Sequence, residues 1–326
     1  MLTAYAIDNG RMVVSAAPDG GAMGSALWID LLNPTPQEDA EVQKFLGIEI
    51  PTREEMQEIE VSSRLYREGD ALYMTAPFLY GVDTGETGST PITFVLSPKG
   101  LVTVRYATPK AFGVFAARAA RNAQQAGSGD AVMVGLFEQV VDRLADILER
   151  IGADMDRTSH EAFRTAKSQQ RASAKDSALK DALIALGQVG EITARASETL
   201  VGLARILSFL AAEGETLVRK ENKARLKTVV RDVRSLTEHA KFLNDKATFL
   251  LDAILGIINI EQTAIIKTFS VVSVALMPPT LIASIYGMNF KMMPELDWTI
   301  GYPLAVVAMI VSAVLPVIYF RRKGWL

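Results

Sequence analysis

The 326-residue sequence contains no cysteine and only two histidines, His160 and His239. The absence of cysteine excludes disulfides and thiolate metal sites, and we expect both histidines to be surface residues of long helices. The formal net charge is −3, so the chain lacks the strong positive field typical of nucleic-acid-binding proteins. The sequence also has no P-loop, GxGxxG fingerprint, HExxH motif or Ser/His/Asp arrangement, and nothing in it therefore indicates an enzyme.

Charged residues are absent from two long segments near the C-terminus, Thr268–Phe290 and Trp298–Phe320. At about 1.5 Å of rise per helical residue, each segment can cross the ~30 Å hydrocarbon layer of a membrane. A pair of buried core helices in a soluble protein is the alternative. Two such segments in succession, joined only by the short link 291–297, favour a membrane hairpin.

The distribution of basic residues predicts the orientation of this hairpin. Three of them follow the second segment, at Arg321–Lys323, whereas the link holds one, Lys291, together with Glu295 and Asp297. The positive-inside rule therefore places both termini in the cytoplasm and the link outside. We expect a multi-pass protein of the cell inner (plasma) membrane, with the lipid bilayer as one of its partners.

The first 108 residues alternate short β-rich runs with helical ones. The β-rich runs are LTAYAID, RMVVSA, ALWIDL, ALYMTAPFLY, PITFVLS and LVTVRYA. The turn SPKG (97–100) between the last two predicts a hairpin, while PTPQEDAEVQKFLG and PTREEMQEIE are typical of helices. In the second of these, Thr52 and Glu55 have the spacing of a capping box. The patterns predict an α/β domain with a mixed sheet.

From Pro109 onward the sequence predicts helices. Within 131–167, apolar residues recur at the spacing of one helix face, at Phe137, Val140, Val141, Leu144, Ile147, Leu148 and Ile151. A second helical run covers 177–211, and a third starts near Glu215 and has no proline before Pro278. We expect one acidic row to be a solvated helix face: Asp142, Asp146 and Glu149.

Small and polar residues form a stripe along the first uncharged segment and the residues just before it. One row repeats every seven residues: Thr263, Ser270, Met277 and Ser284. A second row lies three residues further on: Ile266, Ser273, Thr280 and Gly287. The opposite positions are bulky and apolar: Val271, Val272, Leu281, Ile282 and Ile285. In lipid such a stripe faces partner helices or water, so this periodicity indicates a packing seam or a pore lining equally well.

The segment that ends this stripe carries a family resemblance. YGMNF followed by MPELDW and GYP resembles the signature of the CorA family of magnesium channels. The likeness extends to NIEQTAIIKTFSVVSVALMPPTLIAS, to the terminal RRKGWL and to PTREEMQEIEVSSRLYREGDALYMTAP, and so covers most of the chain. The resemblance implies a homopentamer whose first membrane helices line the pore, beneath which lies a cytoplasmic α/β domain with a long helical funnel.

Together these inferences predict an α+β membrane protein in three parts. Residues 1–108 form the cytoplasmic α/β domain, and 109–262 form the helical funnel, including the start of a long stalk helix. Residues 263–326 form the membrane hairpin. Its first span is expected at about 266–287, the outer loop at about 288–300 and the second span at about 301–320, before a basic cytoplasmic tail.

The resemblance also implies roles for individual residues. Gly287, Met288 and Asn289 match the motif at the outer mouth of the pore. The positions that match the pore lining are Thr263, Ile266, Ser270, Met277, Thr280 and Ser284, and they fall on the stripe found from periodicity. At Thr263 many family members have asparagine, and the sequence does not define the effect of this difference on selectivity, although a ring of hydroxyl groups can still hydrogen-bond a hydrated ion.

Magnesium gives up its water molecules reluctantly, which favours neutral ligands that hydrogen-bond the hydrated ion. Asn289 offers an amide carbonyl for this purpose. Glu295 and Asp297 in the outer loop either concentrate cations or are ordinary solvated charges. The stripe has no histidine or cysteine, so direct ligation of transition metals is not expected.

The resemblance implies that cytoplasmic magnesium also closes the channel by bridging acidic residues of neighbouring subunits. Asp232 in RDVRSL matches one such acid, and the alternative for it is an ordinary ion pair on a helix surface. Magnesium is then both the transported and the regulatory ion, and no other cofactor is expected; cobalt and nickel are possible further cargo. The alternative functions are a zinc or other divalent-metal transporter of the same superfamily and a membrane-anchored scaffold or sensor.

Overall fold

The computed structural model describes residues 1–15, 24–124, 126–168, 172–289, 293–294 and 298–325. The chain forms two compact units. The first unit consists of Met1–Phe163 and Asp181–Leu250, and the second of Arg164–Lys180 and Leu251–Leu326.

A mixed β-sheet is the centre of the first unit. In the described part of the chain, its strands are β1 (Leu2–Asp8), β2 (Arg11–Ser15), β3 (Trp28–Leu32), β4 (Leu65–Glu68), β5 (Ala71–Tyr80), β6 (Gly88–Ser97) and β7 (Gly100–Arg105). Their order across the sheet is β2-β1-β3-β7-β6-β5-β4. Only β3 and β7 pair in parallel; the other neighbours in this sheet of described strands are antiparallel. The predicted mixed sheet and the hairpin at 97–100 are confirmed.

Short helices lie against one face of the sheet: α2 (Pro36–Leu46), α3 (Arg53–Gln57) and α4 (Val61–Arg64). Capping boxes start α2 at Thr35 and α3 at Thr52, where the threonine and a glutamate three residues later satisfy each other's backbone N–H groups. The helix expected over 51–60 is shorter than its sequence suggested, because α3 ends at Gln57 and a separate helix follows. The strand β4, which the sequence did not indicate, lies at the edge of the sheet.

The other face of the sheet packs against α5 (Lys110–Arg121) and α6 (Gly129–Lys167). Aromatic rings fill this interface: the ring centroid of Phe94 lies 5.0 Å from that of Phe137 on α6 and 6.1 Å from that of Phe112 on α5. The apolar face predicted for α6 is buried from Phe137 through Ile151. Periodicity alone was therefore sufficient to orient this helix.

Two further long helices complete the described helical part, α7 (Ala172–Glu213) and α8 (Lys220–Tyr286). In the first unit, α7 approaches β5 closely at Gly202, where an added Cβ would lie 2.8 Å from the Cβ of Ala76. Arg225 of α8 forms a bidentate ion pair with Glu138 of α6, with N–O distances of 2.9 and 2.7 Å. Gly202 thus lets α7 pack closely on β5, and the ion pair attaches α8 to α6.

Two helices are long and apolar enough to cross a membrane among the described residues: α8, and α9 (Gly301–Arg322). Their most apolar windows have mean hydropathies of 1.7 and 2.4, and only 11% and 0% of these windows is buried within the chain. A pair of prolines usually breaks a helix. Here α8 continues without a break through Pro278 and Pro279 and ends at Tyr286. The fold agrees with the predicted α+β membrane protein.

Candidate ion pathway

The predicted stripe lies on the last third of α8, within the second unit. All of its proposed pore-lining positions are described, and none is buried by the chain itself: Thr263, Ile266, Ser270, Met277, Thr280 and Ser284. Its two large apolar members are widely open, with exposed fractions of 64% for Ile266 and 69% for Met277. A single chain therefore leaves the whole stripe available to other copies or to water.

Three hydroxyl groups of the stripe have a common orientation. Thr263 donates its proton to the carbonyl of Asn259 at 2.8 Å, and Thr280 donates to the carbonyl of Leu276 at 2.7 Å. Ser270 does the same with the carbonyl of Ile266 at 2.8 Å. Because each hydroxyl has one proton and two lone pairs, its oxygen can then only accept further hydrogen bonds. The stripe thus presents acceptors on the outside of the helix.

A different face of α8 is covered within the unit. Val271 is 2% exposed and Ala275 is 8% exposed, and both positions lie away from the stripe on the helix circumference. The ammonium group of Lys267 lies 5.8 Å from the ring centroid of Trp325, the residue that follows the end of α9 by three positions. The chain after α9 therefore returns to α8 on the covered face, and the stripe stays open.

The helix ends at the Gly-Met-Asn motif. The amide of Gly287 still donates to the carbonyl of Ala283 at 2.9 Å, but the amide of Met288 makes a shorter-range bond to Ile285 at 3.3 Å. A Cβ on Gly287 would lie 3.1 Å from the carbonyl oxygen of Ala283, so glycine suits this last turn. Asn289 follows as an exposed residue beyond the helix.

The two loop carboxylates expected near this mouth, Glu295 and Asp297, lie outside the described residues. The tandem prolines lie two turns before the motif. Since neither Pro278 nor Pro279 has a backbone N–H, the carbonyls of Val274 and Ala275 lack their usual helical donor. Neutral backbone oxygens are thereby freed within the apolar segment itself.

Asp232 lies on the part of α8 that belongs to the first unit, with 48% of its side chain exposed. Arg231 is its nearest basic neighbour, with a nitrogen–oxygen distance of 3.9 Å. Partial burial raises the pKa of Asp142 on α6. The negative charges of Glu138, Asp146 and Asp232 raise this pKa further, while Arg118 lowers it. The acidic row on α6 is exposed as predicted, yet the structure also brings it within electrostatic range of Asp232, which the sequence did not reveal.

No group of three or more His, Cys, Asp or Glu side chains gathers to hold a metal ion among the residues that the structure describes. Both histidines are exposed, as predicted. A metal site that uses Asp232 within one chain would therefore have few protein ligands, and water molecules or another copy would have to supply the rest.

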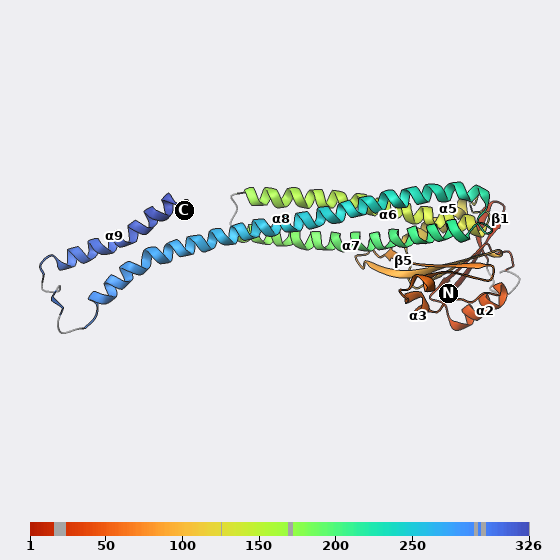
Figure 1. Cartoon of the computed structure of the whole chain (residues 1–326), viewed down its shortest axis with the longest axis horizontal. Coiled ribbons are helices and arrows are strands. Elements are labelled where there is room, and N and C mark those ends of the chain that lie inside the picture. Colours follow the sequence, from red (N-terminus) through yellow and green to blue (C-terminus); the bar gives the residue numbers. More distant parts are fainter. Residues whose placement is uncertain (16–23, 125, 169–171, 290–292, 295–297, 326) are drawn as a thin grey trace. The chain divides into compact units, whose positions relative to one another are not determined.

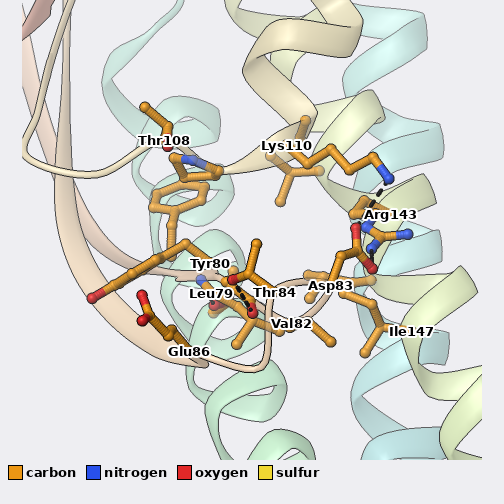
Figure 2. Close-up of a pocket in the computed structure, with 17 residues that line it drawn as sticks. Leu79, Tyr80, Val82, Asp83, Thr84, Glu86, Thr108, Lys110, Arg143 and Ile147 are labelled. Atoms are coloured by element: carbon orange, nitrogen blue, oxygen red, sulfur yellow. Dashed lines mark hydrogen bonds and ion pairs between the residues drawn. The ribbon is translucent and has the colours of Figure 1, made fainter.

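An open cavity of about 560 Å³ in the first unit lies between the β5–β6 turn, the start of α5 and α6. Figure 2 shows Lys110 and Arg143 pointing toward Asp83, to which both are hydrogen-bonded. The hydrogen bond from Lys110, reinforced by Arg143, lowers the pKa of Asp83 to about 2 despite partial burial. Glu86 lies at the other end of the cavity, so the carboxylates of Asp83 and Glu86 do not converge on a cation.

Comparisons with known proteins show the family and agree with the fold. The family described as CorA-like Mg2+ transporter protein matches residues 24–322. The protein named magnesium transport protein CorA in Escherichia coli K12 is 35% identical over 326 residues, which is 100% of both chains. The protein of the same name in Pectobacterium atrosepticum is likewise 35% identical over both full lengths. The solved CorA magnesium transporter of Methanocaldococcus jannaschii, 17% identical, has the same fold, with a TM-score of 0.71 over 100% of this chain and 99% of that one.

Proposed function

Because the chain belongs to the CorA-like Mg2+ transporter family, we propose that it is a homopentameric channel for divalent cations, chiefly hydrated magnesium. It transports an ion across the inner (plasma) membrane and is not an enzyme. The two apolar helices α8 and α9 span the bilayer, with both termini in the cytoplasm. The first unit is the cytoplasmic part of each subunit.

The observation that carries this proposal is the orientation of the stripe hydroxyls. Water molecules bound to Mg2+ turn their oxygens to the ion and their hydrogens outward, so the hydrated ion is a hydrogen-bond donor over its whole surface. The hydroxyl oxygens of Thr263, Ser270 and Thr280 are acceptors because their protons are already donated to the backbone. Rings of such oxygens bind the water shell without stripping it, and because they are neutral the ion can leave again.

The outer mouth follows the same chemistry. Asn289 supplies an amide oxygen from each subunit just beyond the last turn of α8, and Gly287 lets the backbone leave the helix there. Glu295 and Asp297 concentrate cations at this entrance by their negative charge.

One helix per chain cannot enclose a pore, so the exposed stripe requires several copies. The family resemblance favours five. The single-chain exposure of Ile266 and Met277 supports assembly through this face, because large apolar side chains next to an open stripe gain from burial between helices. The bulky residues on the remaining faces meet α9 and lipid.

Cytoplasmic magnesium regulates the channel through carboxylates of the first unit. Asp232 is the residue named from the family pattern, and Asp142 joins it because the two charges repel within the chain. Binding of Mg2+ between such carboxylates of neighbouring subunits relieves the repulsion and favours the closed assembly. The missing ligands come from water and from the adjacent copy.

The decisive experiment measures metal-specific uptake into liposomes that contain only this protein. Magnesium, cobalt, nickel and zinc are offered one at a time under a membrane potential. We expect magnesium uptake in the wild type and weaker uptake in Thr280→Val, which replaces an acceptor with a methyl group. Thr268→Val is the matched control, because Thr268 donates to Ala264 at 3.0 Å in the same way but lies on the opposite side of α8.

Equal magnesium uptake by the wild type and both threonine variants would contradict the acceptor-lined pore. Uptake of zinc without magnesium would favour the alternative, a zinc transporter of the same superfamily. Native mass measurement in mild detergent tests the assembly, and a strict monomer or dimer that retains transport would overturn the pentamer.

A further inference from the structure

Four basic side chains gather where the second unit would meet the cytoplasmic surface of the membrane. This C-terminal basic cluster consists of Lys267 on α8 and Arg321, Arg322 and Lys323 at the end of α9. Trp325 connects its two parts, since its ring lies 5.8 Å from the ammonium group of Lys267 and 5.1 Å from the ring of Phe320. The cluster is therefore contributed by both membrane helices.

The positive charge of this cluster has no carboxylate counterpart nearby along either helix. The sequence of α9 contains no Asp or Glu, and the acidic residue of α8 that precedes Lys267 most closely is Glu261. The two are six positions apart, or about 9 Å along the helix. Glu261 is itself paired with Lys175 at 3.6 Å. Positive charge without balancing acids attracts an anionic partner from outside the chain.

The surroundings of the cluster suit a lipid. Lys323 lies 5.4 Å from the ring centroid of Tyr319, and Trp325 is 39% exposed, so two amphipathic aromatic side chains flank the cations. Along α9 from this end, large apolar side chains are open to contact: Ile318, Leu315, Val314, Val311, Ile310 and Val307. An acyl chain can follow this apolar surface while its headgroup stays at the cations.

We propose that the C-terminal basic cluster binds the headgroup of an anionic phospholipid in the cytoplasmic leaflet. The phosphate accepts charge-assisted hydrogen bonds from Arg321 and Arg322, and Lys267 adds a third positive charge from α8. A bound lipid thereby joins the ends of the two membrane helices. This inference rests on the proposed membrane orientation, but it does not require that magnesium is the cargo.

Further positive charge lies at the end of α6 and the start of α7, in the same compact unit. Lys175 contacts Glu261, which places the start of α7 about 9 Å along α8 from Lys267. Arg164 and Lys167 near the end of α6 are exposed. Arg164 and Lys167 extend the positive potential toward the same leaflet and strengthen attraction to a negatively charged surface.

The test measures lipid binding to the purified full-length protein in detergent by native mass spectrometry. Phosphatidylglycerol is compared with phosphatidylcholine, which carries the same phosphate but no net charge. We expect the wild type to retain phosphatidylglycerol preferentially, and each neutralised cation to weaken this binding about fivefold. The test variant is Lys267→Gln/Arg321→Gln/Arg322→Gln. The matched control, Lys223→Gln/Lys227→Gln/Lys241→Gln, removes the same charge from exposed positions of α8 in the first unit.

Loss of the preference in the test variant alone would support the proposal, and so would its retention in Arg321→Lys/Arg322→Lys. Equal binding of the two lipids by the wild type, or equal losses in the test and control variants, would overturn it. Displacement of the lipid by inorganic phosphate at equal concentration would show a site for free anions instead. If the triple variant does not assemble, the single variant Lys267→Gln leaves the basic tail intact and allows the same comparison of the two lipids. We then expect phosphatidylglycerol binding to weaken about fivefold. Magnesium flux measured in parallel reports on the proposed channel separately.

Discussion

Two phenylalanines show how differently the two units bury apolar side chains. Phe94 in β6 is fully buried between rings of α5 and α6, whereas Phe269 on α8 is 69% exposed. The first unit completes its core within one chain. The apolar windows of α8 and α9 have almost no core of their own, since only 11% and 0% of them is buried within the chain. The packed core of the first unit therefore dominates the stability of the chain, whereas the proposed transport would use surfaces that one chain leaves open.

The largest difference between the units is expected in the free energy of unfolding, when phenylalanine is replaced by alanine in one unit at a time. Phe94→Ala removes a ring from a packed core and should lower the free energy of unfolding by about 3–5 kcal/mol. Phe269→Ala should change the stability of the first unit by less than about 0.5 kcal/mol. Urea unfolding of the full chain in detergent, followed by Trp28 emission in a Trp298→Phe/Trp325→Phe background, measures both. Equal destabilisation by the two changes would show that the units do not differ in this way.

Polar groups differ between the units as well, and Asp130 is the example from the first. Its carboxylate is 3% exposed and accepts hydrogen bonds from the backbone N–H of Arg219 and the side chain of Asn222, each at 2.8 Å, and from Ser128. Burial raises the pKa of this carboxyl, but these hydrogen bonds outweigh it and the pKa is lowered overall. Asp130 thus links the starts of α6 and α8 as an anion.

Asp130→Asn should cost about 1.5–3 kcal/mol of unfolding free energy at neutral pH, because hydrogen bonds to a charged acceptor are lost. Since the folded pKa is depressed, the stabilisation is fully present above the unfolded pKa of about 3.9 and is lost as pH falls through the folded value. The difference between variant and wild type should therefore shrink in acid. Urea titrations of Trp28 emission between pH 7 and 3 measure it, and a difference that grows in acid would contradict this assignment.

Local sequence patterns predicted most elements of the first unit because their determinants are close in sequence. The capping box at Thr52, the turn at 97–100 and the apolar face of α6 each depend on residues within a few positions. The buried pair of Arg105 and Asp30, 2.7 Å apart, was not predictable, because it depends on the parallel pairing of β7 with β3. Such long-range pairings leave no local signal.

The candidate pathway shows the same limit. Periodicity located the stripe and the family resemblance named its residues, but the inward donation of the hydroxyl protons required coordinates. The proximity of Asp142 to Asp232 was missed because a charged row on a helix face normally indicates contact with solvent. Only the packing of α6 beside α8 in the first unit reveals it.

The next largest effect is expected for magnesium uptake when Asn289, an exposed polar residue of the second unit, is replaced. Asn289→Ala removes an amide oxygen from every subunit at the proposed mouth and should lower magnesium uptake about tenfold or more, since each lost hydrogen bond is worth about 1 kcal/mol. The pentamer should remain intact because Asn289 is exposed beyond the helix. Liposome flux and native mass measure the two outcomes. The control is Asn244→Ala, an exposed asparagine of α8 in the first unit, and unchanged uptake in Asn289→Ala would remove the mouth from the proposal.

The smallest effect is expected at Asp232, where the comparison between the units breaks down. Asp232 belongs to the first unit, which has the packed core. Its half-exposed carboxylate is nevertheless open to an ion or to another copy, as the residues of the stripe are. Asp232→Asn should leave unfolding unchanged and raise the internal magnesium concentration that stops flux by about two- to fivefold, because one exposed charge contributes up to about 1 kcal/mol. Glu238→Gln is the control, since Glu238 is a more exposed acid of the same helix, 3.4 Å from Arg234.

Flux through reconstituted protein is followed as internal magnesium rises through the millimolar range. Superimposable inhibition curves for wild type and Asp232→Asn would remove Asp232 from the sensor, and a matching shift in Glu238→Gln would mean that general surface charge, rather than a bridging carboxylate, sets the response.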